Sequence, residues 1–150
     1  MRFANNVKTA LLLGLIMGLA IMFGRILVPG PHGIIYGFLF GGLMNVIAYF
    51  FSDKIALASM GAKEVTEQQA PQLVRTVSQL ATNAGLPMPR VYISPQQAPN
   101  AFATGRNPAH AAVCVTQGLL QAMSERELRG VLAHELAHVR HRDILITTIA

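Results

Sequence analysis

The chain has 150 residues, too few for two domains of ordinary size, and 52% of them are hydrophobic whereas only 13% are charged. A typical soluble domain carries about twice that charged fraction, so an entirely water-soluble protein is disfavoured and part of the chain is expected in lipid. The net charge of +5 comes from basic residues spread along the chain, which argues against a nucleic-acid-binding surface and favours a role in membrane orientation.

Two apolar stretches, residues 9–28 and 33–51, open the chain. At about 1.5 Å per residue, each nearly spans a hydrocarbon core roughly 30 Å thick. The connector ILVPGPHG has the prolines and glycines of a turn, which predicts a helical hairpin in which Asn45 hydrogen-bonds the neighbouring helix. A cleaved signal peptide over residues 1–30 is the competing interpretation, but no small-x-small cleavage pattern follows the apolar stretch.

The distribution of basic residues predicts the orientation of this hairpin. Four of them flank the two segments on their outer sides and one lies beside the turn: Arg2, Lys8, Lys54 and Lys63 against Arg25. Positive charge is retained on the cytoplasmic side of membranes. We therefore expect residues 1–52 to form a transmembrane hairpin anchor, with both of its ends in the cytoplasm, and residues 53–150 to form a cytoplasmic domain.

The polar remainder predicts an α+β fold. Residues 67–84 have apolar positions at helical spacing and end at Gly85, a residue that commonly terminates helices. Three short runs of β character follow at 90–94, 100–105 and 110–116, and they predict a short sheet of two or three antiparallel strands. Cys114, in the last of these runs, is expected to be a buried hydrophobe and not a reactive thiol.

A second helix is predicted from Glu125 onward. The sequence SERE allows the Ser124 hydroxyl and the Glu127 carboxylate to cap each other's backbone amides, a pattern that begins helices. Leu128, Leu132 and Leu136 continue an apolar stripe, and no Gly–Pro break follows before the last residue. The stretch AHELAHVRHRD, residues 133–143, is therefore expected to be helical.

This stretch contains the pattern H-E-x-x-H. His134 and His138 fall on one face of a helix, one turn apart, so both imidazoles can bind one Zn²⁺ ion. Glu135 lies about 100° from His134 around the helix, where it can accept a proton from a water at the metal without being a ligand itself. The pattern predicts a zinc hydrolase with one Zn²⁺ per chain, in which Glu135 is the general base and later the proton donor to a leaving amine.

The third protein ligand is open. His141 lies about 10 Å along the helix axis from His134, too far for both to bind one ion. Asp143 is expected to form a structural ion pair, and a hydrogen bond to a metal ligand is the alternative. The other candidates are weak for reasons of burial or position: Cys114, Glu125, Glu127, Glu64 and Glu67.

Over almost its whole length the chain resembles the HtpX family of membrane zinc metalloproteases, which are related to the CAAX-prenyl proteases. The resemblance rests on the N-terminal hairpin, on NAFATGRNPAHAAVCVTQGLL and on LRGVLAHELAHVRHRDILI. It implies that His134 and His138 are zinc ligands, that Glu135 is the catalytic base, and that NAFATG is an edge strand whose residues bind substrate by strand addition: Asn100, Ala101, Phe102 and Ala103.

The resemblance also implies a function. Family members are multi-pass proteases of the cell inner (plasma) membrane that act in stress response and protein quality control, cutting misfolded or damaged membrane proteins on the cytoplasmic side. They are about twice as long, and they take a third ligand from a glutamate on a later helix. The chain is therefore expected to be the N-terminal part of a zincin-like domain, ending at the start of a third apolar segment and having low or no activity by itself.

Two rival functions stay open on the sequence. The chain could be a non-catalytic membrane protein or pseudoenzyme that retains the H-E-x-x-H helix without completing the site. It could also be a basic membrane-surface or nucleic-acid binder, although no clustered cationic face is evident. The expected partners are the lipid bilayer and unfolded or damaged membrane protein substrates, with no nucleic acid.

Overall fold

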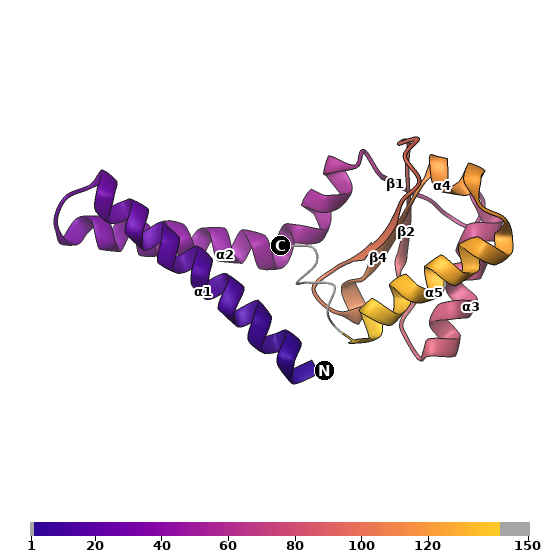
Figure 1. Ribbon diagram of the computed structural model, residues 1–150, viewed down its shortest axis with the longest axis horizontal. Coiled ribbons are helices and arrows are strands. Elements are labelled where there is room, and N and C mark those ends of the chain that lie inside the picture. Colours follow the sequence, from indigo (N-terminus) through magenta and orange to yellow (C-terminus); the bar gives the residue numbers. More distant parts are fainter. Residues whose placement is uncertain (1, 142–150) are drawn as a thin grey trace. The chain divides into compact units, whose positions relative to one another are not determined.

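The computed structural model describes residues 2–141, and the chain divides into two compact units, residues 1–51 and residues 52–150 (Figure 1). The first unit is a pair of long helices. The second unit combines a sheet with helices, so the prediction of an α+β fold after a helical hairpin is confirmed.

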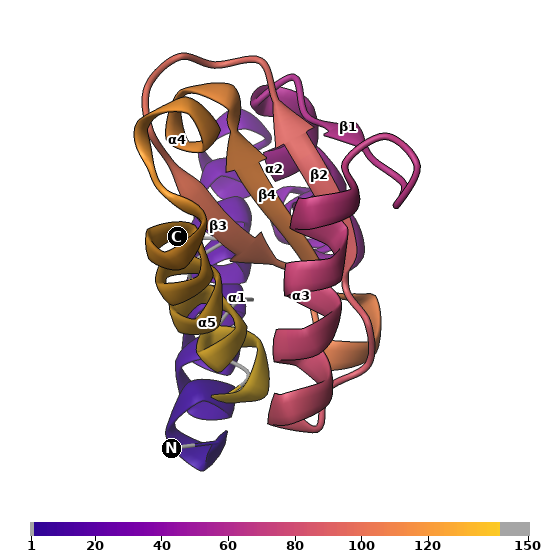
Figure 2. The same cartoon turned by 90° about the vertical axis from the view of Figure 1, so that its right-hand side faces the viewer.

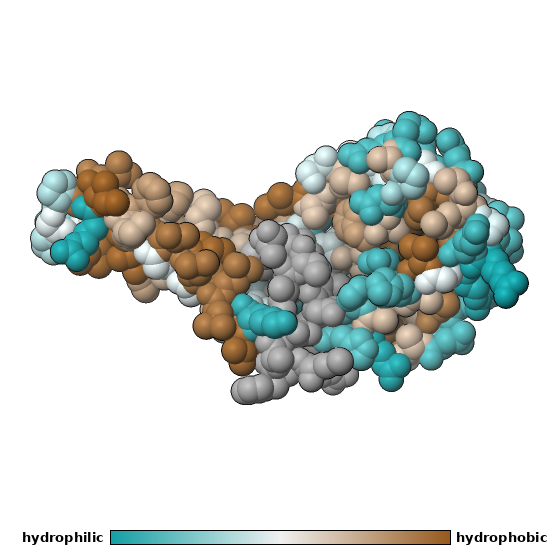
Figure 3. Space-filling view, viewed as in Figure 1, coloured by the Kyte–Doolittle hydropathy of each residue, from teal (hydrophilic) through white to brown (hydrophobic). Residues whose placement is uncertain are grey.

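The hairpin consists of α1 (Arg2–Leu27) and α2 (Pro31–Ser59), and the last turns of α2 belong to the second unit. Gly30, at φ 90°, makes the turn with a backbone conformation that suits glycine. Asn45 Nδ2 donates to the carbonyl oxygen of Leu13 at 3.0 Å, as predicted. Both helices are long and apolar enough to cross a membrane, and apolar side chains dominate their surface in Figure 3; that they do cross one stays a prediction.

Close packing of the two helices depends on small residues. A Cβ atom placed on Gly37 of α2 would lie 2.6 Å from both the Ala20 oxygen and the Ile21 Cα of α1. One placed on Gly24 would overlap the backbone of α2 at Gly33, and one placed on Gly41 would lie 2.9 Å from Ala20 Cβ. Side chains at these positions would push the helices apart, which is the usual reason for small residues between membrane helices.

Replacing Gly37 with leucine is therefore expected to destabilise the hairpin by about 1–3 kcal/mol, the usual cost of overpacking. Gly14→Leu is the matched control, because among the described residues nothing lies within 4 Å of a Cβ atom built at Gly14. Unfolding of each variant in detergent, followed by the loss of helical circular dichroism, measures the difference. Equal destabilisation by the two substitutions would contradict the packing account.

The second unit is built on a four-stranded mixed sheet of order β1-β2-β4-β3. Its strands are β1 (Lys63–Glu64), β2 (Arg90–Ser94), β3 (Ala101–Thr104) and β4 (Ala112–Thr116). The prediction of a purely antiparallel sheet is wrong, because β2 and β4 pair in parallel while β1–β2 and β3–β4 are antiparallel. The β1 strand was not predicted.

The chain path explains the parallel pair. After Ser94 the chain passes along a loop, forms β3, turns at Gly105 and only then returns as β4 between β2 and β3. Parallel neighbours need such a long connection, which here contains β3 and the short 3₁₀ helix η1 (Pro108–His110) and no α-helix. Gly105 has φ 135°, and a Cβ atom there would overlap the His110 carbonyl, so this turn requires glycine.

Helices α3 (Pro71–Ala84) and α5 (Glu125–His141) cover one face of the sheet, as Figure 2 shows, and α4 (Gln117–Ala122) follows β4. The main core lies between these helices and the strands; its most buried members include Val77, Val113, Val115, Leu132, Leu136 and Val139. A smaller cluster on the other side of β4 joins Leu57, from the end of α2, to Ala112 and Cys114.

Helix α3 begins four residues later than predicted and ends where predicted. A turn closes between Thr66 and Gln69, whose side-chain oxygen accepts from the Thr66 amide at 3.0 Å, and Pro71 then occupies the first turn of the helix. Gly85 ends α3 at φ 66°, the left-handed conformation expected of a glycine cap.

Cys114 is buried as predicted: its exposed fraction is 0%, and burial raises the pKa of its thiol to about 11. Because the thiolate is the reactive form, native protein at pH 8 is expected to resist iodoacetamide at Cys114, whereas denatured protein is modified. The raised pKa also affects the free energy of unfolding. The contribution of the neutral thiol to this free energy is fully present below the ordinary thiol pKa of 9.0 and is lost as the pH rises through about 11. Mass spectrometry after timed labelling checks the first expectation, and rapid modification of the native protein would contradict it.

Candidate metal centre

Helix α5 carries the H-E-x-x-H residues, and a reciprocal cap fixes its first turn. The Glu127 carboxylate accepts from the Ser124 amide at 2.8 Å and from the Ser124 hydroxyl at 2.7 Å, and the Glu127 amide donates back to the Ser124 oxygen. These hydrogen bonds lower the pKa of Glu127. The capping box is therefore confirmed, and it sets the rotation of every side chain that follows on α5.

The position of each site residue around α5 follows from the buried stripe. Leu132, Leu136 and Val139 face the core. At about 100° per residue, Glu135 lies on one border of this stripe and the two histidines lie beyond it, farther from the core. Glu135 and His138 are half-buried and His134 is exposed. Around the helix, the residues that face the core are thus followed by the Glu135 carboxylate and then by the two imidazoles.

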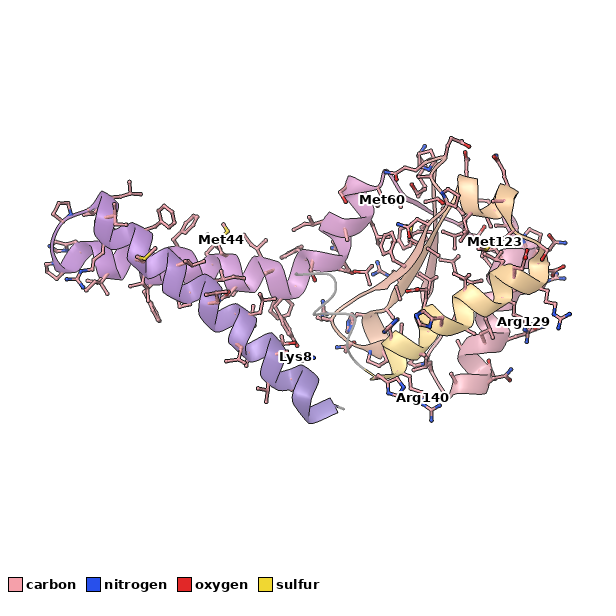
Figure 4. All side chains as sticks on the ribbon, in the orientation of Figure 1. Lys8, Met44, Met60, Met123, Arg129 and Arg140 are labelled. Carbon is pink, nitrogen blue, oxygen red and sulfur yellow. The ribbon has the colours of Figure 1, made fainter. Side chains whose placement is uncertain are left out.

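The opposite border of the stripe carries arginines and faces α3. Arg129 donates from Nη1 to Gln79 Oε1 of α3 at 3.0 Å. Figure 4 shows Arg129 and Arg140 projecting from α5 away from the sheet. Within residues 125–141, the arginines of α5 therefore lie apart from Glu135 around the helix.

The two imidazoles meet edge to face. His134 Nε2 and His138 Nε2 are 3.3 Å apart, and the rings are perpendicular with centroids 4.8 Å apart. Two nitrogens bound to one tetrahedral zinc ion, each at about 2.0–2.1 Å, are separated by about 3.3–3.4 Å. The same nitrogen of each ring is thus already placed at the separation that a shared zinc ion requires, so these residues fit the metal.

Glu135 points toward the sheet. Its Oε2 atom accepts a hydrogen bond from the backbone amide of Ala103 in β3 at 3.2 Å. In the described part of the chain, β3 is an edge strand, because β4 is its single neighbour in the sheet. The Ala103 amide therefore lies on the outer edge of β3, and the proposed base lies against that edge.

The pairing register shows which atoms of β3 line this edge. Asn100 O accepts from the Thr116 amide at 2.9 Å, so residues 100, 102 and 104 direct their backbone groups to β4. Ala101 and Ala103 then direct theirs outward. Their small side chains lie on the core face near α5, whereas the Phe102 side chain packs against the smaller cluster on the other face. Of the four residues predicted to bind substrate, Ala101 and Ala103 direct backbone groups away from β4, and the Ala103 amide is the donor to Glu135; substrate binding by these residues stays a prediction.

The candidates for a third ligand lie elsewhere. Glu64 is on β1, at the edge opposite β3, where it accepts from the Tyr92 hydroxyl at 3.3 Å. Glu67 pairs with Arg75 at 2.7 Å, and Cys114 belongs to the smaller cluster. Within residues 2–141, no group of three His, Cys, Asp or Glu side chains could hold a metal ion. Asp143 and the predicted third apolar segment lie outside the described residues.

The contact between Glu135 and the Ala103 amide was not predicted. The motif alone places Glu135 beside the metal, but it carries no information on which strand lies against the helix. One feature of the sequence could have indicated this contact, namely the alternation of small residues in NAFAT. Alanines on one face of a strand allow a helix to approach closely.

Comparison with known proteins identifies the family of this chain. The profile of Peptidase family M48 matches residues 67–150. The chain is 54% identical over 147 residues to "Protease HtpX homolog" of Sulfurihydrogenibium sp. (strain YO3AOP1), covering 98% of this chain and 49% of that protein. It is 57% identical over 145 residues to proteins of the same description from Burkholderia cenocepacia (strain HI2424) and Burkholderia multivorans (strain ATCC 17616 / 249), covering 97% of this chain and 50% of each.

The chain thus spans about half the length of these relatives. The match to the family includes β2, β3, β4 and the whole described part of α5, so it contains both histidines, Glu135 and the edge strand. The resemblance to HtpX proteases noted in the sequence is confirmed along nearly the whole chain. The protein belongs to Peptidase family M48.

Proposed function

We propose that the protein is a membrane-anchored, zinc-dependent endopeptidase that cleaves extended segments of misfolded or damaged membrane proteins. The observation that carries this proposal is the placement of His134 Nε2 and His138 Nε2 3.3 Å apart, next to a carboxylate that lies against the free edge of a strand. Membership of a peptidase family is the second support.

His134 and His138 would hold the zinc ion through their Nε2 atoms, and a third ligand would come from outside the described residues. Zinc, when bound, lowers the pKa of water to about 7 and polarises a carbonyl group as a Lewis acid. The two imidazoles must be neutral to bind it, so zinc affinity is expected to fall as the pH drops below the ordinary histidine pKa of about 6.5.

Glu135 is the proton carrier in this proposal. Its carboxylate lies half-buried between the core and the histidines, within reach of both the metal position and β3. It takes a proton from the attacking water and later delivers that proton to the amine of the departing peptide. The Ala103 amide, by donating to Oε2, holds the carboxylate in place between these two steps.

The outer edge of β3 would bind the substrate. A peptide that adds alongside β3 makes main-chain hydrogen bonds with Ala101 and with the Ala103 carbonyl, while the Ala103 amide stays bound to Glu135, and these bonds do not depend on the side chains of the peptide. An added strand requires an extended segment, which unfolded or damaged proteins expose and folded proteins do not. The edge therefore favours unfolded substrates and permits broad sequence tolerance.

The hairpin α1–α2 would anchor this site in the cell inner membrane. Its apolar surface and the flanking basic residues support a double crossing with the second unit on the cytoplasmic side, where Lys54 and Lys63 lie just after the apolar stretch. An anchored protease meets membrane proteins at high local concentration.

Metal removal tests the proposal. The complete protein in detergent is expected to cleave an unfolded membrane protein or a denatured casein, to lose that activity in 1,10-phenanthroline, and to regain it when zinc is added back. Gel electrophoresis of the substrate measures each step. Cleavage that persists without metal, or an inactive zinc-loaded protein, would contradict the proposal, and the second result would favour the pseudoenzyme interpretation.

A further inference from the structure

The loop that leads into β3 is attached to the end of β4, in large part through one buried side chain. Residues 95–100 connect β2 to β3 and are all exposed. Exposed loops of this length are ordinarily mobile. This one is tied at several points to Thr116, the last residue of β4, whose exposed fraction is 0%.

The Thr116 hydroxyl forms hydrogen bonds with the backbone of both Ala98 and Asn100. Its Oγ1 atom donates to the Ala98 carbonyl at 2.9 Å and accepts from the Asn100 amide at 2.9 Å. The Thr116 amide donates to the Asn100 carbonyl at 2.9 Å. Asn100 is thus bound through both of its backbone groups, immediately before the first residue of β3.

The same hydroxyl caps the next helix. Thr116 Oγ1 also accepts from the Leu119 amide at 3.3 Å, which places it at the N-cap of α4. One oxygen atom therefore determines where β4 ends, where α4 begins and where β3 begins. The hydrogen bonds of this oxygen go to Ala98, Asn100 and Leu119, so a change at this atom acts first on the start of β3 and not on α5.

Close packing at Gly118 supports the attachment independently. The Gly118 amide donates to the Gln96 carbonyl at 3.1 Å, and a Cβ atom at Gly118 would overlap the Gln97 backbone. The loop lies against the start of α4 so closely that a side chain is excluded there. Even alanine would displace residues 96–98.

The register of β3 depends on this attachment. Ala101 and Ala103 direct their backbone groups outward because Asn100 is paired with Thr116, and a shift of one residue would turn those groups toward β4. We propose that Thr116 is a positioning residue for the substrate strand: its hydroxyl fixes the start of β3 and thereby places the outer edge of β3 opposite Glu135. This inference rests on the proposed peptidase function.

Thr116→Val and Thr116→Ser in the zinc-loaded complete protein test the inference. Valine keeps the shape and removes the hydroxyl, so KM for a peptide substrate is expected to rise about tenfold while kcat changes less than about threefold, a ratio that corresponds to the loss of one or two hydrogen bonds. Serine keeps the hydroxyl and is expected to restore KM. Zinc content should be that of the wild type in both variants, because the histidines are on α5.

Hydrogen exchange gives a readout that does not need activity. Peptides covering residues 95–104 are expected to exchange about tenfold faster in Thr116→Val, with peptides of α5 unchanged. Equal acceleration along α5, an unchanged KM, or failure of serine to restore it would overturn the inference. If valine prevents folding, Gly118→Ala replaces it, since it displaces the same loop with the hydroxyl present and is expected to raise KM similarly.

This experiment distinguishes failure of the proposed peptidase function from failure of the positioning role of Thr116. A wild-type protein without zinc-dependent cleavage overturns the proposed function and this inference with it. A wild-type protein that cleaves, together with a Thr116→Val variant of unchanged KM, overturns the positioning role alone.

Discussion

Glu135→Gln is expected to lower kcat/KM of the complete protein by about 10²–10⁴-fold, the usual contribution of a general base. Glutamine has the same shape, and its oxygen can still accept from the Ala103 amide, so the strand should stay in place. It cannot accept a proton from water at neutral pH. Steady-state kinetics on a fluorogenic peptide measure the loss.

Zinc binding separates this role from a structural one. Because Glu135 is not expected to be a ligand, the glutamine variant should bind one zinc per chain and show the wild-type unfolding temperature. Retained activity would exclude Glu135 as the base. Lost zinc would assign it to the metal instead, and the hydrolytic mechanism proposed above would then need a different base.

His138→Ala is expected to reduce zinc affinity by more than about 100-fold, and to abolish cleavage with it, because a ligand contributes more than the surrounding residues that merely orient ligands. His134→Ala should behave alike, since its Nε2 atom is the other member of the pair that lies 3.3 Å apart. Competition with a chromophoric chelator measures the affinity.

His141→Ala is the matched control for both substitutions. His141 is exposed on the same helix, in its last turn, and lies about 10 Å from His134 along the axis. The substitution His141→Ala removes an imidazole without removing a proposed ligand, so zinc affinity should stay within about threefold of the wild type. A loss equal to that of His138→Ala would mean that the histidines bind metal loosely and without a defined site.

Helices α3 and α5 were predictable because their signals are local, whereas the six-residue helix α4 was not predicted. The Ser124–Glu127 cap, the glycine at position 85 and the apolar stripe of α5 each act within a few residues, and the structure has all three. The spacing of His134, Glu135 and His138 is equally local once a helix is assumed. That period alone placed the two imidazoles on one face, one turn apart, but it did not predict the perpendicular arrangement of their rings.

The sheet was only partly predictable because its order depends on distant pairs. Nothing in residues 90–116 distinguishes a hairpin from a strand that leaves and returns, so the parallel pairing of β2 with β4 was missed. The two-residue strand β1 is too short to carry a pattern. The partly buried ion pair between Asp53 and Arg90, 2.9 Å long, joins residues 37 positions apart and has no local signal at all.

The central claim is that His134 and His138 bind zinc through their Nε2 atoms. Zinc K-edge X-ray absorption of the complete protein, compared with the His134→Ala, His138→Ala double variant, tests it most directly. We expect one zinc per chain with two imidazole ligands at about 2.0–2.1 Å, and no bound zinc in the double variant. Equal zinc content in both proteins, or a zinc shell without imidazole scattering, would contradict the account.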